Sequence, residues 1–206
     1  MELRTFLLLS PCVLMSLALH ELAHAWAAWK LGDPTAKEQG RLTLNPLKHL
    51  DPLGTAMFAI TALATNTPFG WAKPVPVQPR FFRRPKEGMA LVAAAGPATN
   101  FALALAALAV LVHIDLEGEG EEVTYYAYLV NVVLGIFNLI PIPPLDGSRI
   151  VGIFMSDATY RQWARLDMYG MVVVLGLFIV FREESSELLG EAYDAVTRVM
   201  TTIVGA

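Results

Sequence analysis

The chain has 206 residues, of which 55% are hydrophobic and only 17% are charged, and its formal net charge is −4. Soluble globular proteins carry about 25% charged residues, so a soluble domain of this length could not easily solvate itself with so few. The composition excludes a disordered chain and an ordinary cytosolic enzyme, and the single cysteine, Cys12, excludes a disulfide scaffold. No basic cluster with interleaved aromatic residues points to a nucleic acid as partner. We therefore predict an integral membrane protein surrounded by the lipid bilayer.

Apolar runs locate the predicted membrane helices. Residues 88–112 and 123–145 contain no Asp, Glu, Lys or Arg, and each run exceeds the ~20 residues that a helix needs to cross a bilayer. Residues 3–29 form a third long run, whereas 52–68 and 168–181 are shorter. We predict an all-α polytopic membrane protein. It is a bundle of about four to five membrane helices or segments, with a short extended or re-entrant region after the first helix and a C-terminal amphipathic helix.

The chain divides into a membrane-embedded core at 1–182 and an amphipathic helix at 183–206, where polar residues recur at spacings of three and four. Within the core we expect helices at 3–30, 88–112, 123–147 and 166–182, and a re-entrant or edge-strand region at 31–87. Basic residues flank 52–68 on both sides, so this segment is expected to re-enter or form a hairpin unless the charge bias misleads.

Lys and Arg in the connecting segments predict the orientation, because cytoplasmic loops carry the excess of both. Five basic residues lie between Gly70 and Glu87, whereas 113–122 has none and holds five acidic residues. The first segment is therefore predicted inside and the second outside. We expect a multi-pass protein of the cell membrane, the inner or cytoplasmic membrane in a prokaryote.

The first apolar run contains the HExxH sequence His20-Glu21-Leu22-Ala23-His24. A spacing of four residues places both imidazoles on one helix face, where they can take two corners of a tetrahedral Zn²⁺ site, one ion per chain. Glu21 lies beside them as the expected catalytic base. A buried polar cluster joining two helices is the alternative. It is disfavoured because charged groups cost ~2.5 kcal/mol or more each inside a membrane helix and are expected only where something compensates them.

A catalytic zinc site needs a third protein ligand. Asp146 borders the run 123–145 at its cytoplasmic end, and His24 lies near the cytoplasmic end of its own helix, so their depths agree. Three prolines within residues 141–144 deny the chain its helical hydrogen bonds, which predicts an unwound stretch from which a carboxylate followed by Gly147 can turn inward. The active site is therefore predicted near the cytoplasmic side of the membrane.

The HExxH motif and the sequence from Asn138 to Gly147 together resemble the paired signature of the site-2 protease family, the intramembrane zinc metalloproteases. The element at 96–100 (GPATN) and the sequences at 45–52 and 70–77 resemble its compact bacterial and archaeal branch, without PDZ or CBS domains. The resemblance implies that His20, His24 and Asp146 bind zinc and that Glu21 is the general base. It also implies that Asn138 lies near a substrate, a transmembrane protein cut in the bilayer.

Three further residues are candidates for substrate binding: Asn138, Asn100 and Pro144. The Asn138 amide could stabilise an oxyanion or simply bond to another helix, while Asn100 suits helix packing better. The sequence from Trp71 to Gln78, with prolines at 74 and 76, can only be extended. It could accept an unwound substrate as an added strand or be a surface loop.

A membrane zinc-binding or transport protein with the same ligands is the alternative function. A transporter is disfavoured because its polar residues would be expected at several depths, and Glu21 would have no task in it. Whether the protein forms a homo-oligomer stays open.

Overall fold

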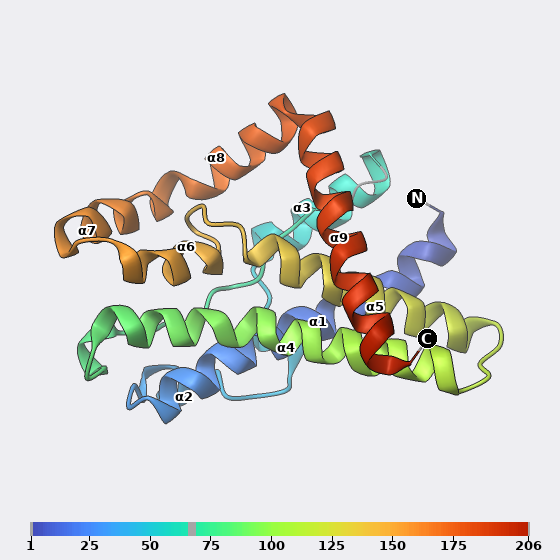
Figure 1. The fold of residues 1–206 in the computed structure, drawn as a ribbon, viewed down its shortest axis with the longest axis horizontal. Helices are drawn as coiled ribbons and strands as arrows, with labels where there is room; N and C mark the ends of the chain where they lie inside the picture. The colour runs from blue at the N-terminus through green and yellow to red at the C-terminus, as the bar shows by residue number, and fades with distance from the viewer. Residues whose placement is uncertain (1, 66–68, 206) are drawn as a thin grey trace.

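The computed structural model describes residues 2–65 and 69–205, and the regular elements in that part of the chain are all helical (Figure 1). In chain order the α-helices are α1 (Leu3–Lys30), α2 (Thr35–Glu38), α3 (Pro52–Thr65), α4 (Pro85–His113), α5 (Glu119–Asn138), α6 (Asp146–Val151), α7 (Asp157–Arg165), α8 (Asp167–Val180) and α9 (Arg182–Val204). Short 3₁₀ turns lie at Pro46–Lys48, Pro79–Phe81 and Gly152–Phe154. The all-α prediction is confirmed for these residues.

Two helices in the described part of the chain, α1 and α4, are both long and apolar enough to cross a membrane. They have 28 and 29 residues, which at 1.5 Å per residue gives each a length of roughly 42–44 Å. This length exceeds the ~30 Å of a bilayer core. Helix α5 has 20 residues, with three glutamates in its first turn. The structure thus identifies two candidate spans, fewer than the four to five membrane segments predicted.

Helices α1, α4 and α5 form the centre of the fold. They run along the long axis of the molecule and each contacts the other two (Figure 1). Helix α9 crosses α4 and α5 and contacts both. The buried cluster where these three helices meet consists of Ala104, Leu108, Tyr128, Val132 and Met200. The predicted C-terminal amphipathic helix is therefore present as α9, with one face packed on the bundle and with Leu188 and Ile203 exposed.

The helix expected over 123–147 is instead divided. Helix α5 begins earlier and ends at Asn138, residues 139–145 are irregular, and α6 begins at Asp146. Prolines at 141, 143 and 144 supply no amide hydrogen, so helical hydrogen bonding cannot continue through them. The unwound stretch expected there lies directly before the carboxylate.

The α6–α7–α8 arm lies along one side of the bundle (Figure 1). Lys86, in the first turn of α4, forms an ion pair with Asp157 of α7 at 2.9 Å. The hydrogen bond from Lys86 lowers the pKa of the Asp157 carboxyl. Arg149 of α6 pairs with Asp167, the first residue of α8. Charged contacts therefore connect this arm to α4 and connect α6 to α8.

The edge strand expected within 31–87 does not form as a strand in the described residues. A single antiparallel bridge joins Leu50 to Ala72, and the chain from Lys73 to Gln78 is otherwise held by side chains. Because Pro74 and Pro76 have no amide hydrogen, this segment cannot build a regular ladder.

Candidate metal centre

Three side chains predicted as metal ligands meet in the interior of the fold. His20 and His24 are buried on α1, and Asp146 reaches them from the first turn of α6. The two Nε2 atoms are 2.9 Å apart, and the Oδ2 atom of Asp146 lies 3.2 Å from the Nε2 of His20 and 3.3 Å from that of His24. The HExxH spacing and the distant aspartate thus converge on one point.

Both imidazoles are oriented by hydrogen bonds on their far sides. The Nδ1 of His20 lies 2.6 Å from the Oδ1 of Asn100, and the Nδ1 of His24 lies 2.7 Å from the backbone carbonyl of Val92. A carbonyl oxygen can only accept, so each Nδ1 is assigned as the protonated donor. In its neutral form each ring then presents the Nε2 lone pair toward Asp146.

A chain of amides fixes the orientation of Asn100. Its Nδ2 donates to the Oδ1 of Asn131 at 2.8 Å, and the Nδ2 of Asn131 donates to the Oγ of Ser16 at 2.9 Å and to the carbonyl of Ala127 at 2.8 Å. Ser16 lies on α1, one helical turn before His20. The network joins α1, α4 and α5 behind the first histidine, a placement typical of groups that orient metal ligands.

The three inward-facing atoms suit a cation. Among the described residues the buried Oδ2 of Asp146 has no hydrogen-bond partner. When both imidazoles are neutral, the two nearby nitrogens present lone pairs to it. Three acceptors packed together repel one another unless a positive ion lies between them. A tetrahedral zinc ion with bonds of about 2.0–2.2 Å holds its ligand atoms roughly 3.3–3.6 Å apart. The two distances from Asp146, 3.2 and 3.3 Å, are close to this range, and the 2.9 Å between the two Nε2 atoms is shorter. The donor set of two imidazoles and one carboxylate also fits zinc.

Gly96 gives the histidines their space. A Cβ atom at this position of α4 would lie 2.5 Å from the Cε1 atoms of both His20 and His24. The glycine of the GPATN element thus allows α4 to approach α1 closely at the depth of the site. A similar constraint applies at Gly147, where a side chain would overlap the backbone of Leu139 and Ile140.

Glu21 lies between the two histidines in the sequence, and its side chain is buried. It contacts a different part of the chain. Its Oε2 accepts a hydrogen bond from the backbone N–H of Val75 at 3.0 Å. The predicted base therefore touches the proline-containing segment Lys73–Gln78. No property of Val75 itself signals this contact in the sequence; only the extended character of the segment does.

The remaining predicted residues have different surroundings. Asn138 is half-buried at the end of α5 and donates through Nδ2 to the carbonyl of Leu134, one turn earlier in its own helix. Pro144 is half-buried in the irregular stretch before Asp146. Asn100 is fully buried and contacts His20. Sequence reasoning did not single out Asn131 or Ser16, although a polar residue in an apolar run was an available signal.

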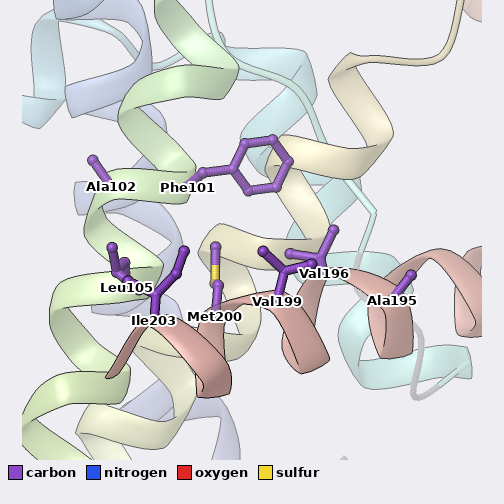
Figure 2. Close-up of a pocket in the computed structure, with 8 residues that line it drawn as sticks. All are labelled: Phe101, Ala102, Leu105, Ala195, Val196, Val199, Met200 and Ile203. Carbon is purple, nitrogen blue, oxygen red and sulfur yellow. The ribbon is translucent and has the colours of Figure 1, made fainter. Parts of the chain in front are cut away.

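An apolar hollow of about 500 Å³ lies elsewhere, between α4 and α9 (Figure 2). Figure 2 shows Phe101 and Leu105 of α4 opposite Val199 and Met200 of α9. No residue in its lining is ionisable. Acid–base or metal chemistry therefore belongs to the His–Asp centre and not to this hollow.

Comparison with known proteins supplies the family. The model of peptidase family M50 matches residues 117–181. A Bacillus subtilis protein named "Putative zinc metalloprotease YwhC" is 41% identical over 176 residues, which are 81% of this chain and 78% of the relative. The chain belongs to peptidase family M50. This is the site-2 protease family that the motifs resemble, so that prediction is confirmed.

Other M50 relatives agree. "Putative zinc metalloprotease Rip2" of Mycolicibacterium smegmatis is 32% identical over 179 residues, covering 84% of this chain and 67% of the relative. A zinc metalloprotease of Methanocaldococcus jannaschii is 30% identical over 142 residues, covering 69% of this chain and 32% of the relative. No solved structure matches the chain. The protein is a zinc metalloprotease of a membrane-embedded family, with Zn²⁺ as its cofactor.

Proposed function

We propose that this M50 metalloprotease is an intramembrane endopeptidase that cuts transmembrane protein substrates, as in regulated intramembrane proteolysis. One observation carries the proposal. The candidate ligand atoms of His20, His24 and Asp146 all lie within 4.8 Å of one another. Two of these residues lie on α1, a helix that is long and apolar enough to cross a membrane. A site built into such a helix can reach a peptide bond inside the bilayer.

His20, His24 and Asp146 are the proposed zinc ligands. When bound there, Zn²⁺ supplies Lewis acidity, which lowers the pKa of water toward neutrality and polarises the scissile carbonyl. Asn100 and the Val92 carbonyl keep the two imidazoles in the tautomer that presents Nε2. The surrounding apolar helices exclude bulk water, which strengthens every electrostatic interaction at the site.

Glu21 is the proposed general base. It takes the proton from the attacking water and then returns it to the nitrogen of the leaving amine. The bond from Val75 holds one carboxylate oxygen, Oε2, in place. Glu21 is not one of the three residues whose ligand atoms converge. Its carboxylate is therefore not needed to bind the metal and can transfer a proton.

The segment Lys73–Gln78 is the proposed docking edge for an unwound substrate. The Val75 carbonyl and both backbone polar groups of Val77 make no hydrogen bond within the described chain. Substrate peptide groups, which lose their helical hydrogen bonds on unwinding, could pair with these groups as an added strand. We further propose that Asn138 and Pro144 contact the substrate. Asn100 would act on substrate through His20, because both ends of its amide are engaged inside the protein.

The predicted orientation places the site near the cytoplasmic side of a multi-pass protein. Basic residues lie near the ends of α1 and α6, at Lys30 and Arg149, and this position agrees with the charge bias of cytoplasmic loops. Four to five membrane segments, counting the shorter helices beside α1 and α4, remain part of this proposal.

The deciding experiment compares wild type with Glu21→Gln at equal zinc occupancy, using a single-span substrate reconstituted in liposomes. The amide nearly preserves the shape of the carboxylate but cannot take a proton. We expect cleavage to fall by ~10²–10⁴ while zinc stays bound. Equal cleavage by the two proteins would remove Glu21 from the mechanism. Zinc flux across the liposome membrane, without cleavage by wild type, would favour the transporter alternative.

A further inference from the structure

Two buried charges close to the site have no role in the proposed chemistry. Asp33 is fully buried and Arg41 is 5% exposed. Neither forms an ion pair with another side chain in the described part of the protein. Burying an unpaired charge is costly unless hydrogen bonds compensate it. The hydrogen-bond partners of Asp33 and Arg41 therefore indicate the role of each side chain.

Both charged side chains form hydrogen bonds with the backbone of one segment, Lys73–Gln78. Arg41 donates through Nη2 to the carbonyl of Lys73 at 2.6 Å and through Nη1 to the carbonyl of Pro74 at 3.2 Å. Asp33 accepts through Oδ2 from the N–H of Gln78 at 2.6 Å, while its Oδ1 accepts from the backbone and hydroxyl of Thr35. The Arg41 guanidinium thus binds the N-terminal end of the segment Lys73–Gln78, and the Asp33 carboxylate binds its C-terminal end.

The middle of the same segment contacts the base. Val75 lies between the two held ends, and its N–H meets the Oε2 of Glu21. Asp33 and Arg41 also lie in the part of the chain that directly follows α1, the helix that carries Glu21. The N–H of Asp33 bonds to the carbonyl of Ala28 in α1, and the N–H of Arg41 bonds to that of Ala36 in α2. The position of the segment is therefore set relative to α1.

We propose that Arg41 and Asp33 are positioning residues that hold the segment Lys73–Gln78 at both ends, so that the Val75 N–H orients the Glu21 carboxylate. The inference rests on the proposed function of Glu21 as the base. The guanidinium is suited to the task because its planar fork reaches two consecutive carbonyls, which a single ammonium group cannot do with the same geometry. The prolines contribute by limiting the conformations of the segment.

Amide hydrogen exchange tests this arrangement without requiring activity. Pro74 and Pro76 have no amide hydrogen, so residues 74–77 contain only two exchangeable backbone amides, those of Val75 and Val77. In the zinc-loaded protein in detergent micelles we expect one slow amide, Val75, and one fast amide, Val77. Arg41→Lys should speed exchange at Val75 by at least about tenfold, the factor expected for a lost hydrogen bond to a charged group. Arg80→Lys, the same change at an exposed neighbouring arginine, should leave it unchanged.

A double-mutant cycle separates positioning from general loosening. Glu21→Ala removes the acceptor and should by itself release Val75. Adding Arg41→Lys to Glu21→Ala should then speed Val75 no further, since both changes act on one hydrogen bond. A slow Val75 amide in Glu21→Ala, or additive effects in the double variant, would overturn the proposal. If Arg41→Lys loses zinc or speeds exchange of the α1 amides, the variant disturbs the fold as a whole, and Asp33→Asn is used instead. Its control is Asp194→Asn, the same change on the exposed face of α9.

Activity gives a second readout. Arg41→Lys should lower kcat by about tenfold or more at unchanged zinc content, while Arg80→Lys matches wild type. An unchanged kcat in Arg41→Lys, measured with Val75 released, would overturn the role of this contact in catalysis. Absence of cleavage by wild type would instead refute the proposed function, and the exchange measurements would still decide whether the segment is held as described.

Discussion

The Nδ1 atom of His20 lies 2.6 Å from the Oδ1 atom of Asn100, and both side chains are buried. Asn100 in turn donates to Asn131, whose amide reaches Ser16 on the helix that carries the histidine. The polar residues of three helices are therefore connected behind one proposed ligand. In an apolar bundle each of these groups would be costly without its partner, so the network both joins the helices and fixes the direction of the imidazole.

Replacement of Asn100 by Ala should weaken zinc binding by about 10–100-fold, the usual effect of removing a group that orients a ligand. The imidazole of His20 would lose its acceptor at Nδ1 and could rotate or change tautomer. Zinc affinity, measured by competition with a chelator, checks the expectation. Asn138→Ala is the matched control, because the Asn138 amide bonds only within its own helix among the described contacts. Equal affinity of the Asn100→Ala and Asn138→Ala variants would contradict the assigned role.

Asp146→Ala should lose most of the single zinc expected per chain, as should His20→Ala and His24→Ala. Each variant leaves only two of the three ligands, so the site would lack the third protein ligand of a catalytic zinc centre. Metal analysis of the purified variants provides the measurement. Asp157→Ala offers a control of the same residue type, because this exposed carboxylate pairs with Lys86 and lies outside the site. Full zinc content in Asp146→Ala would show that another group completes the site.

Much of the site could be predicted from sequence because it depends on local geometry. The spacing of His20 and His24 follows from one helical turn, and prolines at 141–144 indicate a break before Asp146. The approach of Val75 to Glu21 could not be derived in this way. It depends on how the chain folds back after α3, through contacts between residues far apart in sequence such as Arg41 and Lys73.

The fold shows the same division. An apolar run indicates a helix but not where the helix ends, and the predicted segment at 123–147 joins two helices that the structure separates. Asn100 illustrates the limit for single residues. Sequence shows an amide within an apolar helix, which suits packing, whereas its contact with His20 depends on the close approach that Gly96 allows between α1 and α4.

The predicted orientation can be checked by labelling introduced cysteines from outside the cell. Cysteines at positions 119, 84 and 161 would all be accessible to a reagent on their own side, because the native side chains are exposed. The charge bias predicts labelling at 119 but not at 84 or 161. The buried Cys12 is first replaced by Ala. Labelling at 84 from outside would invert the orientation and place the metal centre near the opposite membrane face.

The last prediction concerns the ion pair between Arg149 and Asp167. Arg149 lies three residues after Asp146 in α6, and Asp167 is the first residue of α8. Trp163 of α7 also donates to the carbonyl of Ser148 at 3.1 Å, so the arm holds α6 at more than one point. Because Asp146 is in the first turn of α6, releasing this helix should misplace the carboxylate. We expect Arg149→Ala to weaken zinc binding by roughly tenfold, the lower end of the range for groups that act through a ligand.

Charge reversal separates the ion pair from other effects of removing Arg149. The single variants Arg149→Asp and Asp167→Arg should each weaken zinc binding, since each places like charges together. The double variant should recover part of the loss, because opposite charges again face each other. Arg165→Ala, at an exposed position on α7, serves as the control. If the two reversals simply added, Arg149 and Asp167 would act independently, and the position of Asp146 would have to depend on the irregular stretch at 139–145 alone.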